Sequence, residues 1–253
     1  MAHLVTGGTK GIGLAIAKRL SAKRLSKKDE DIFLVYHSDD SAAAKAKREL
    51  EAIGAKAHLI KADIGTIDGA ENIHHAVAKT GARLSGIVHS AALIYPTTLL
   101  DADLEKFTKA VETNGLSLLY LVQKLLPVMD RGTSIIFITS GGARIPQPRY
   151  GALGIGNALA ESIVRYLVME LAPNGIRING VAPGLVATTS VADMVGSQDA
   201  AERLYEKAAK SNPSGRMSQD SDYASLVEYL MSPEAEFIQG QVIAATGGVG
   251  VIG

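Results

Sequence analysis

The residues nearest the start of the chain have the types and spacing of a phosphate-binding turn. They read Thr6-Gly7-Gly8-Thr9-Lys10-Gly11-Ile12-Gly13, after a short apolar run and before a helix-like segment. Glycine lets the chain bend tightly and lets a pyrophosphate approach the backbone, and a helix N-terminus offers N–H groups to phosphate oxygens. Gly13 would also let the first helix pack closely on the strand before it. The pattern predicts a nucleotide site; the alternative is a glycine-rich turn that binds no ligand.

Composition excludes or disfavours several other kinds of reactive centre. The chain has no cysteine, which excludes a thiol nucleophile, a disulfide framework and a cysteine-bound zinc. Its six histidines show no metal-ligand spacing, and the adjacent His74 and His75 would point different ways on a helix. We therefore expect no metal site and a surface position for this pair.

The elements that must position the turn alternate along the whole chain. Seven short runs are continuously apolar, as in strands covered on both faces: His3–Thr6, Ile32–Tyr36, Ala57–Lys61, Gly86–His89, Ile135–Thr139, Arg177–Val181 and Val242–Ala245. Between them lie helix-like segments: Ile12–Ser21, Ser41–Ile53, Gly69–Lys79, Leu104–Met129, Asn157–Ala172, Ala200–Lys210 and Tyr223–Met231. This alternation predicts an α/β fold, a single domain over residues 1–253 with a doubly wound, Rossmann-type parallel sheet and helices on both faces.

Length and charge narrow the class of protein further. A chain of 253 residues fits one large α/β domain, and its 26 Lys+Arg balance 26 Asp+Glu, which argues against nucleic acid as a partner. No apolar run approaches the roughly 20 residues of a membrane span, and the N-terminus leaves no room for a signal peptide. We expect a cytoplasmic protein with no nucleic-acid or membrane partner.

Two helix-like stretches, Ala110–Leu126 and Ala158–Leu171, are apolar around most of their circumference. A helix that only covers a sheet should keep a polar outer stripe, so we expect a homodimer or homotetramer formed through these stretches. The alternative is that the same chain covers them.

The segment Thr188–Pro213 could form a lid over the site. The loops Leu93–Leu99 and Gly141–Pro148 would line the pocket, and their aliphatic residues suit an acyl chain or a polycyclic ketone.

The spacing TGxxxGxG of the glycine-rich turn resembles that of the short-chain dehydrogenase/reductase family. The resemblance runs through the whole chain, since the C-terminal segments Asn212–Met217, Gly240–Val242 and Gly247-Gly248 are also similar. The stretch Pro183-Gly184-Leu185-Val186-Ala187-Thr188 resembles the PGxVxT loop that the family places beside the nicotinamide. The resemblance therefore implies a nicotinamide dinucleotide, with contacts from Pro183, Gly184, Val186 and Thr188.

The residues after the second strand bear on which nicotinamide dinucleotide binds. An acidic residue there would accept the ribose hydroxyls and repel a 2′-phosphate. This chain has His37 and Ser38 at that position, and Lys10 supplies a cation nearby. NADP(H) is therefore favoured over NAD(H). Asp39 or Asp40 would favour NAD(H) if either one occupied the ribose position.

The resemblance also implies contacts with the adenine and with the middle of the cofactor. Asp63 and Ile64 follow the third strand, where the family contacts the adenine, although Asp63 could instead cap the next helix. His89-Ser90-Ala91-Ala92 stands where the family usually has Asn-Asn-Ala-Gly. The small Ala91 lets the cofactor approach, but the asparagines that would brace the neighbouring strands are lost.

The resemblance further implies hydride transfer to or from a carbonyl or an activated double bond. In the family a tyrosine exchanges the proton, a serine orients the substrate, and a lysine lowers the tyrosine pKa and holds the ribose. Ser140 matches the serine, and Asn114 matches a helix asparagine that supports a water chain. The lysine position is Asn157 and the usual tyrosine position is Leu153, so the YxxxK pair is lost. Tyr150 lies seven residues before Asn157, a spacing similar to that of enoyl-acyl-carrier-protein reductases, especially the type III branch.

The uncharged Asn157 should change the chemistry of this group. It cannot lower the pKa of Tyr150, which we expect near 10, but its amide can bond a ribose hydroxyl. A neutral phenol can donate a proton and is a poor base, so reduction should suffer less than oxidation. We expect NADP(H)-dependent reduction of an enoyl thioester or a ketone, and this substrate could be linked to a carrier. The residues expected to act in the reaction are Asn114, Ser140, Tyr150 and Asn157.

Less specific roles remain for the same residues. Tyr150 could be an ordinary packed tyrosine, Asn157 a helix N-cap, and Ser140 a turn residue. The protein could then bind the cofactor as a scaffold without chemistry. A lyase or isomerase is disfavoured, because it has less need of a pyrophosphate site.

Overall fold

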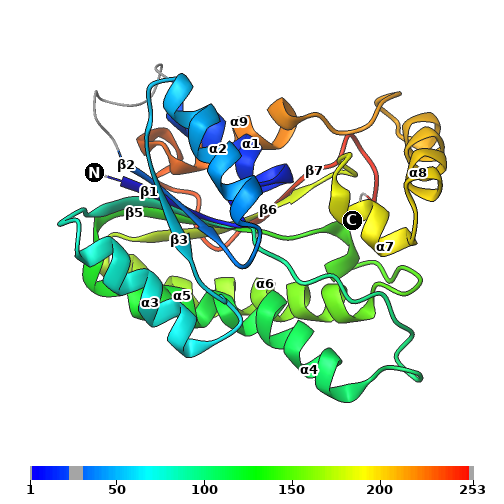
Figure 1. The fold of residues 1–253 in the computed structure, drawn as a ribbon, viewed down its shortest axis with the longest axis horizontal. Helices are drawn as coiled ribbons and strands as arrows, with labels where there is room; N and C mark the ends of the chain where they lie inside the picture. The colour runs from blue at the N-terminus through cyan, green and yellow to red at the C-terminus, as the bar shows by residue number, and fades with distance from the viewer. Residues whose placement is uncertain (1, 23–30, 251–253) are drawn as a thin grey trace.

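The computed structural model describes residues 2–22 and 31–250 and contains a seven-stranded sheet between two layers of helices (Figure 1). The strand order is β3-β2-β1-β4-β5-β6-β7, and every neighbouring pair is parallel. The strands are β1 (Ala2–Thr6), β2 (Asp31–Tyr36), β3 (Lys56–Lys61), β4 (Leu84–His89), β5 (Met129–Ile138), β6 (Arg177–Pro183) and β7 (Val242–Ala245). The predicted doubly wound parallel sheet is confirmed.

The helices form one layer on each face of the sheet (Figure 1). One layer consists of α1 (Gly11–Ser21), α2 (Asp40–Ala52) and α9 (Asp220–Met231). The other consists of α3 (Ile67–Ala78), α4 (Leu104–Val111), α5 (Ser117–Leu125) and α6 (Gly151–Leu171). Two further helices, α7 (Thr189–Val195) and α8 (Gln198–Ser211), lie beyond the end of the sheet at which the strands finish (Figure 1). The predicted coverage of both faces is therefore confirmed.

Helices cover both faces of the sheet and bury its central strands, which explains why these strands are continuous apolar runs. Successive residues of a strand point to opposite faces. In β1, Leu4 packs with residues of α3, α5 and α6, whereas Val5 packs with residues of α1, α2 and α9. Ile135 and Ile136 of β5 repeat this division. A strand buried in this way cannot show the apolar–polar alternation of a half-exposed strand.

The predicted helix Leu104–Met129 is divided into shorter elements. After α4 come a π-helical turn over Glu112–Leu116, then α5, and then a 3-10 turn over Leu126–Val128. The apolar periodicity continues across the π-helical turn and so does not reveal the break. Such turns are frequent at functional sites, and this one contains Asn114.

Helix α6 begins at Gly151, six residues before the predicted start. Asn157 therefore lies inside the helix, and the alternative that it is a helix N-cap is wrong. Glycines in the first turns lower helix propensity, but here they allow close approach. A Cβ on Gly156 would lie 2.6 Å from the Cβ of Asn114, and a Cβ on Gly154 would lie 2.6 Å from the carbonyl oxygen of Gly142.

Large apolar side chains remain exposed on the outer surface of α6 within this single chain, next to the charged Arg165 and Glu170. Tyr166 and Met169 are 77% and 79% exposed. In length and composition the helical segment Gly151–Asn174 could cross a membrane, but half of its most apolar window is buried inside the protein, as in a core helix. Among the described residues no second helix passes the same test.

The contact between α6 and the π-helical turn generates a stability prediction. Gly156→Ala should lower the free energy of unfolding by about 1–3 kcal/mol, because the new methyl group meets the backbone and Cβ of Asn114. Gly151→Ala is the matched control, since its methyl group meets only the flexible end of Leu99. Urea denaturation of both variants measures the difference. Equal effects would contradict the close packing, because helix propensity alone favours alanine in both.

Candidate cofactor and active site

The predicted cofactor residues gather at the edge of the sheet where the strands end. The glycine-rich turn joins β1 to α1, and β1 lies beside β4, where the strand order changes direction. Ligands of open α/β sheets bind at such a point. The other predicted residues follow their own strands at the same edge: His37 and Ser38 after β2, Asp63 and Ile64 after β3, Ala91 after β4, and Gly184, Val186 and Thr188 after Pro183 of β6.

The glycine-rich turn is closely packed between two of these segments. Gly7 has φ of +63°, and a Cβ there would lie 2.9 Å from the Cα of Ala91. Gly11 has φ of +48°, and a Cβ there would lie 3.3 Å from Cγ2 of Thr188. A Cβ on Gly13 would overlap the carbonyl oxygen of Gly7. Glycine is therefore needed at these positions, as the sequence pattern predicted.

The start of α1 has the character of an anion site. Lys10 occupies the N-cap position without a capping side-chain bond, and the first turn carries no acidic residue. The first N–H groups of a helix have no partner within the helix and carry a partial positive charge. These features fit the pyrophosphate of a dinucleotide.

The charges beyond β2 are paired with one another. Lys10 forms an ion pair with Asp39, and Asp39 also caps α2 by accepting a bond from the N–H of Ala42 at 2.9 Å. Asp40 accepts a bond from Lys61 at 2.8 Å and one from Tyr36. The positive charge predicted at Lys10 is present, but the carboxylate of Asp39 balances it. An incoming 2′-phosphate would have to compete with Asp39 for it.

Asp63 does not cap α3, so that alternative is wrong. Thr66 is the cap, because its hydroxyl accepts a bond from the N–H of Gly69 at 3.0 Å. The Asp63 carboxylate instead accepts bonds from Lys109 at 3.0 Å and from the N–H of Gly65 at 2.9 Å. Partial burial raises its pKa, but these bonds outweigh burial and hold the pKa below the ordinary value.

His89 connects the neighbouring strands in place of the missing asparagines. Its ring is fully buried at the end of β4. Nδ1 lies 2.8 Å from the hydroxyl of Thr6 in β1, and Nε2 lies 2.8 Å from the hydroxyl of Ser117 in α5. The expectation that bracing is lost with the asparagines is therefore wrong, because one imidazole bridges two strands and a helix.

The neighbours of His89 fix its protonation state. Ser117 donates its proton to the carbonyl of Thr113 at 2.6 Å, so it must accept a bond from Nε2–H. Thr6 accepts bonds from the N–H groups of Ser90 and Ala91, at 3.1 and 3.2 Å, and donates its own proton to Nδ1. Burial lowers the pKa of His89 to about 4, which keeps the ring neutral.

Three of the four predicted catalytic residues meet at one oxygen. Tyr150 Oη donates a bond to Ser140 Oγ at 3.0 Å, and Asn157 Nδ2 donates a bond to the same oxygen at 3.2 Å. A serine hydroxyl has two acceptor positions and one proton. Since both acceptor positions are filled, the proton of Ser140 is available for a further acceptor.

The phenol of Tyr150 is neutral at ordinary pH. Burial raises its pKa above the usual value, and the bond to Ser140 offsets this only in part. Among residues 2–22 and 31–250 no positive charge lowers this pKa. The sequence predicts a pKa near that of a free phenol; the structure shifts the pKa upward because the ring is partly buried against Gly142, in the turn that follows Ser140.

Asn114 lies close to this group but bonds elsewhere. Its Oδ1 accepts from the N–H of Leu93 at 2.8 Å, and its Nδ2 donates to the carbonyl of Leu93 at 2.9 Å. It contacts Gly156, the neighbour of Asn157, and so holds the loop after β4 against the start of α6. The structure shows it as a brace for this loop.

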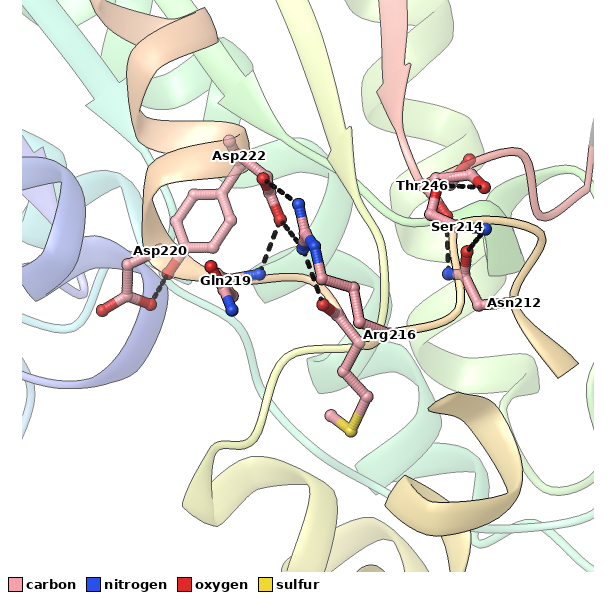
Figure 2. Close-up of polar contacts among 10 residues, drawn as sticks. Asn212, Ser214, Arg216, Gln219, Asp220, Asp222 and Thr246 are labelled. Carbon is pink, nitrogen blue, oxygen red and sulfur yellow. Dashed lines mark hydrogen bonds and ion pairs between the residues drawn. The ribbon is translucent and has the colours of Figure 1, made fainter. Parts of the chain in front are cut away.

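The segment Thr188–Pro213, predicted as a lid, contains α7 and α8. One bond within the segment connects α8 to its first residue, and another connects its end to Thr246. Tyr205 Oη of α8 donates to the carbonyl of Thr188 at 3.2 Å. Asn212 Nδ2 donates to the carbonyl of Thr246 at 3.0 Å (Figure 2). The sequence missed α7, a short helix of seven residues with no buried side chain.

The C-terminal segments support the loop after β6. Figure 2 shows Arg216 bonded through both terminal nitrogens to Asp222, at 2.6 and 2.8 Å. The Arg216 guanidinium holds the pKa of Asp222 at about 2, so the pair stays charged at neutral pH. A Cβ on Gly184 would lie 3.3 Å from both Ser218 and Thr246, so these segments pack directly on the predicted nicotinamide loop.

Comparison with known proteins gives a consistent match over nearly the whole chain. Residues 7–250 match the protein family described as Enoyl-(Acyl carrier protein) reductase. An uncharacterized oxidoreductase from Methylorubrum extorquens is 31% identical over 249 residues, covering 97% of this chain and 96% of that protein. The structure of the enoyl-[acyl-carrier-protein] reductase (NADH) from Aquifex aeolicus is similar with a TM-score of 0.86 and 26% identity, covering 100% of this chain and 97% of that one. An angucycline C-6 ketoreductase with bound NADP gives a TM-score of 0.84 and 27% identity, covering 98% and 94%.

The buried His89 generates a prediction about acid stability. Its pKa falls from 6.5 in the unfolded chain to about 4 in the folded protein, so only the unfolded chain takes up this proton between those values. The contribution of His89 to stability should therefore fall by about 3 kcal/mol as the pH drops from 6.5 to 4. His89→Asn should make the pH dependence of urea denaturation less steep than in wild type; the slope that remains includes His3, whose pKa burial also lowers to about 4. The same slope in wild type and in His89→Asn would contradict the assignment.

Proposed function

This chain belongs to the short-chain dehydrogenase/reductase family, and we propose that it is an NADP(H)-dependent reductase of an enoyl thioester or a ketone. One observation carries the proposal. A phenol and an amide converge on the hydroxyl of Ser140 at the carboxyl edge of a parallel sheet, beside a glycine-rich turn suited to a pyrophosphate. The arrangement provides a proton donor and an orienting hydroxyl where ligands of such sheets bind.

In this proposal the chain binds and orients the reactants and supplies a proton. When bound, the nicotinamide supplies the hydride. Ser140 uses its remaining proton to hold the substrate oxygen, because both of its acceptor positions are filled by Tyr150 and Asn157. Tyr150 is neutral, and its proton can turn from Ser140 Oγ to the substrate oxygen as negative charge develops there, which frees one acceptor position of Ser140.

No cation among the described residues acts on Tyr150, so this group stays in its acid form near neutral pH. An ordinary phenol, with a pKa of about 10, is ionised in roughly one molecule in a thousand at pH 7, and burial raises the pKa of Tyr150 above the ordinary value. The residue is therefore a ready acid and a poor base. Reduction needs the acid, whereas oxidation of an alcohol needs the base, so the site favours reduction.

The choice of NADP(H) rests on the residues after β2 and in the glycine-rich turn. His37 and Ser38 are exposed, and neither repels a phosphate. Lys10 can turn from Asp39 to a 2′-phosphate, because both partners are about half exposed to solvent. The Aquifex aeolicus enzyme is described with NADH and the angucycline ketoreductase with NADP, so the family accommodates either cofactor.

The proposal extends to the assembly and setting of the protein. The exposed Tyr166 and Met169 lie on the outer side of α6, which we propose packs against a second copy in a homodimer or homotetramer. We place the protein in the cytoplasm, since the lack of cysteine suits a reducing compartment. The substrate is a small acyl or carbonyl compound, free or carrier-linked, that fits the aliphatic loops.

The first test is turnover with NADPH. Wild-type protein should bind NADPH more tightly than NADH and oxidise it in the presence of enoyl thioesters or ketones. Tyr150→Phe should lower kcat by about 100-fold or more, because the proton donor is lost, while the Kd for NADPH changes by less than about twofold. Fluorescence titration and loss of NADPH absorbance are the two measurements.

The results of this test separate the proposal from its alternative. NADPH binding without turnover across both substrate panels would favour a scaffold that keeps the cofactor and has lost its chemistry. Turnover unaffected by Tyr150→Phe would overturn the role of Tyr150. Tighter binding of NADH than of NADPH would overturn the cofactor assignment.

A second test restores the missing cation. Asn157→Lys should lower the pKa of Tyr150 by about one to three units, because an ammonium group favours the phenolate. The pH profile of kcat for oxidation should then move to lower pH by about the same amount, because the base form of Tyr150 becomes populated nearer neutral pH. Asn157→Met is the control of similar length without charge. An oxidation profile that moves equally in both variants, or in neither, would contradict the argument.

A further inference from the structure

A buried carboxylate lies next to the catalytic group and has no part in the proposed reaction. Glu161 is only 4% exposed and lies four residues after Asn157 on α6. Residues four apart on a helix share one face, so Glu161 follows Asn157 along the side that packs on the sheet. A buried carboxylate is costly unless it is fully paired.

The partners of Glu161 flank Ser140 on both sides in the sequence. Thr139, immediately before Ser140, donates its hydroxyl proton to one carboxylate oxygen at 2.9 Å. Arg144, four residues after Ser140, donates its Nε–H to the other oxygen at 3.2 Å. One carboxylate thus holds the chain where it enters and where it leaves the turn that carries Ser140.

The intervening turn is in contact with the proposed acid. Residues Gly141–Ala143 form a 3-10 turn, in which the N–H of Arg144 bonds to the carbonyl of Gly141 at 3.1 Å. A Cβ on Gly142 would overlap the ring of Tyr150, so the turn lies directly on the phenol. Movement of this turn would therefore displace both Ser140 and Tyr150.

We propose that Glu161 is a positioning residue, which acts through Thr139 and Arg144 to hold Ser140 and Tyr150 in reactive geometry. We refer to Glu161, Thr139 and Arg144 as the Glu161 cluster. The kinetic part of this inference rests on the proposed function. Its structural part, that the cluster immobilises the turn, stands independently.

The electrostatics of the cluster favour this role over a simple contribution to stability. Glu161 is buried whereas Arg144 is about half exposed. The pair is a weak source of stability, because desolvation of Glu161 offsets most of the attraction, but removing Arg144 would leave the buried charge of Glu161 uncompensated. The pair does fix the direction of both side chains, and a displacement of about 1 Å at a reacting group can cost about 100-fold in rate. The cluster therefore affects geometry more than the overall free energy of unfolding.

The kinetic test compares Glu161→Ala with Glu170→Gln, an exposed glutamate on the same helix. Glu161→Ala should lower kcat by about 10- to 100-fold, with KM and the Kd for NADPH changed by less than about twofold. Glu161→Gln keeps an acceptor for Thr139 and should recover part of kcat. Arg144→Lys, which keeps the charge, should retain more activity than Arg144→Met. Glu170→Gln should behave as wild type.

The second readout does not depend on activity. In Glu161→Ala, amide hydrogen exchange in residues 141–145 should become about 10-fold faster, because their turn is no longer held. Exchange in residues 163–171 of α6 should not change, which distinguishes local release from unfolding of the helix.

The two readouts separate failure of this inference from failure of the proposed function. Faster exchange in a protein that turns over no substrate would retain the structural part and overturn the proposed function. Unchanged exchange in residues 141–145 would overturn the inference, whatever the activity. Faster exchange with unchanged kcat would overturn the positioning role. A rise in KM with unchanged kcat would also overturn it, since it indicates a loss of binding only.

Discussion

The site depends on two hydrogen bonds that end on one oxygen. Tyr150 and Asn157 both donate to Ser140 Oγ, and this arrangement orients the phenol, the amide and the serine proton together. Because the amide of Asn157 is neutral, the bonds provide geometry without an electrostatic field that would favour a phenolate. The partly buried Tyr150 keeps its proton, and this is the form that the reduction we propose requires.

The rest of the fold brings these three residues together. Ser140 follows β5, while Tyr150 and Asn157 belong to the first turns of α6, and close approach at its glycines brings that helix against the turn after Ser140 and against Asn114. On the other side of the cofactor edge, His89 fixes β1 to β4 and α5. The glycine-rich turn therefore rests on a rigid strand pair. The proposed cofactor site and the proposed proton donor are thus held in place by separate contacts around the same sheet.

The sequence predicted the parts of this structure that local pattern determines. The seven apolar runs are strands, and they show no apolar–polar alternation because helices cover both faces of the sheet. The glycine-rich turn could be identified because its residues are close together in the sequence. The early start of α6 could not be predicted, because contacts with Asn114 and Gly142 outweigh the low helix propensity of its glycines. The bracing role of His89 was missed for a similar reason, since Thr6 lies 83 residues away. Its place at the family's usual asparagine was the one available signal.

The state of the Tyr150 phenol is the point on which this account depends most. Its pKa can be measured from the ultraviolet difference spectrum of tyrosinate between wild-type protein and Tyr150→Phe, titrated without cofactor. We expect no tyrosinate signal from Tyr150 at about pH 9, because burial raises its pKa and no cation among the described residues opposes this. A signal from Tyr150 that is half complete below about pH 9 would contradict it, since that result requires a positive charge at the phenol.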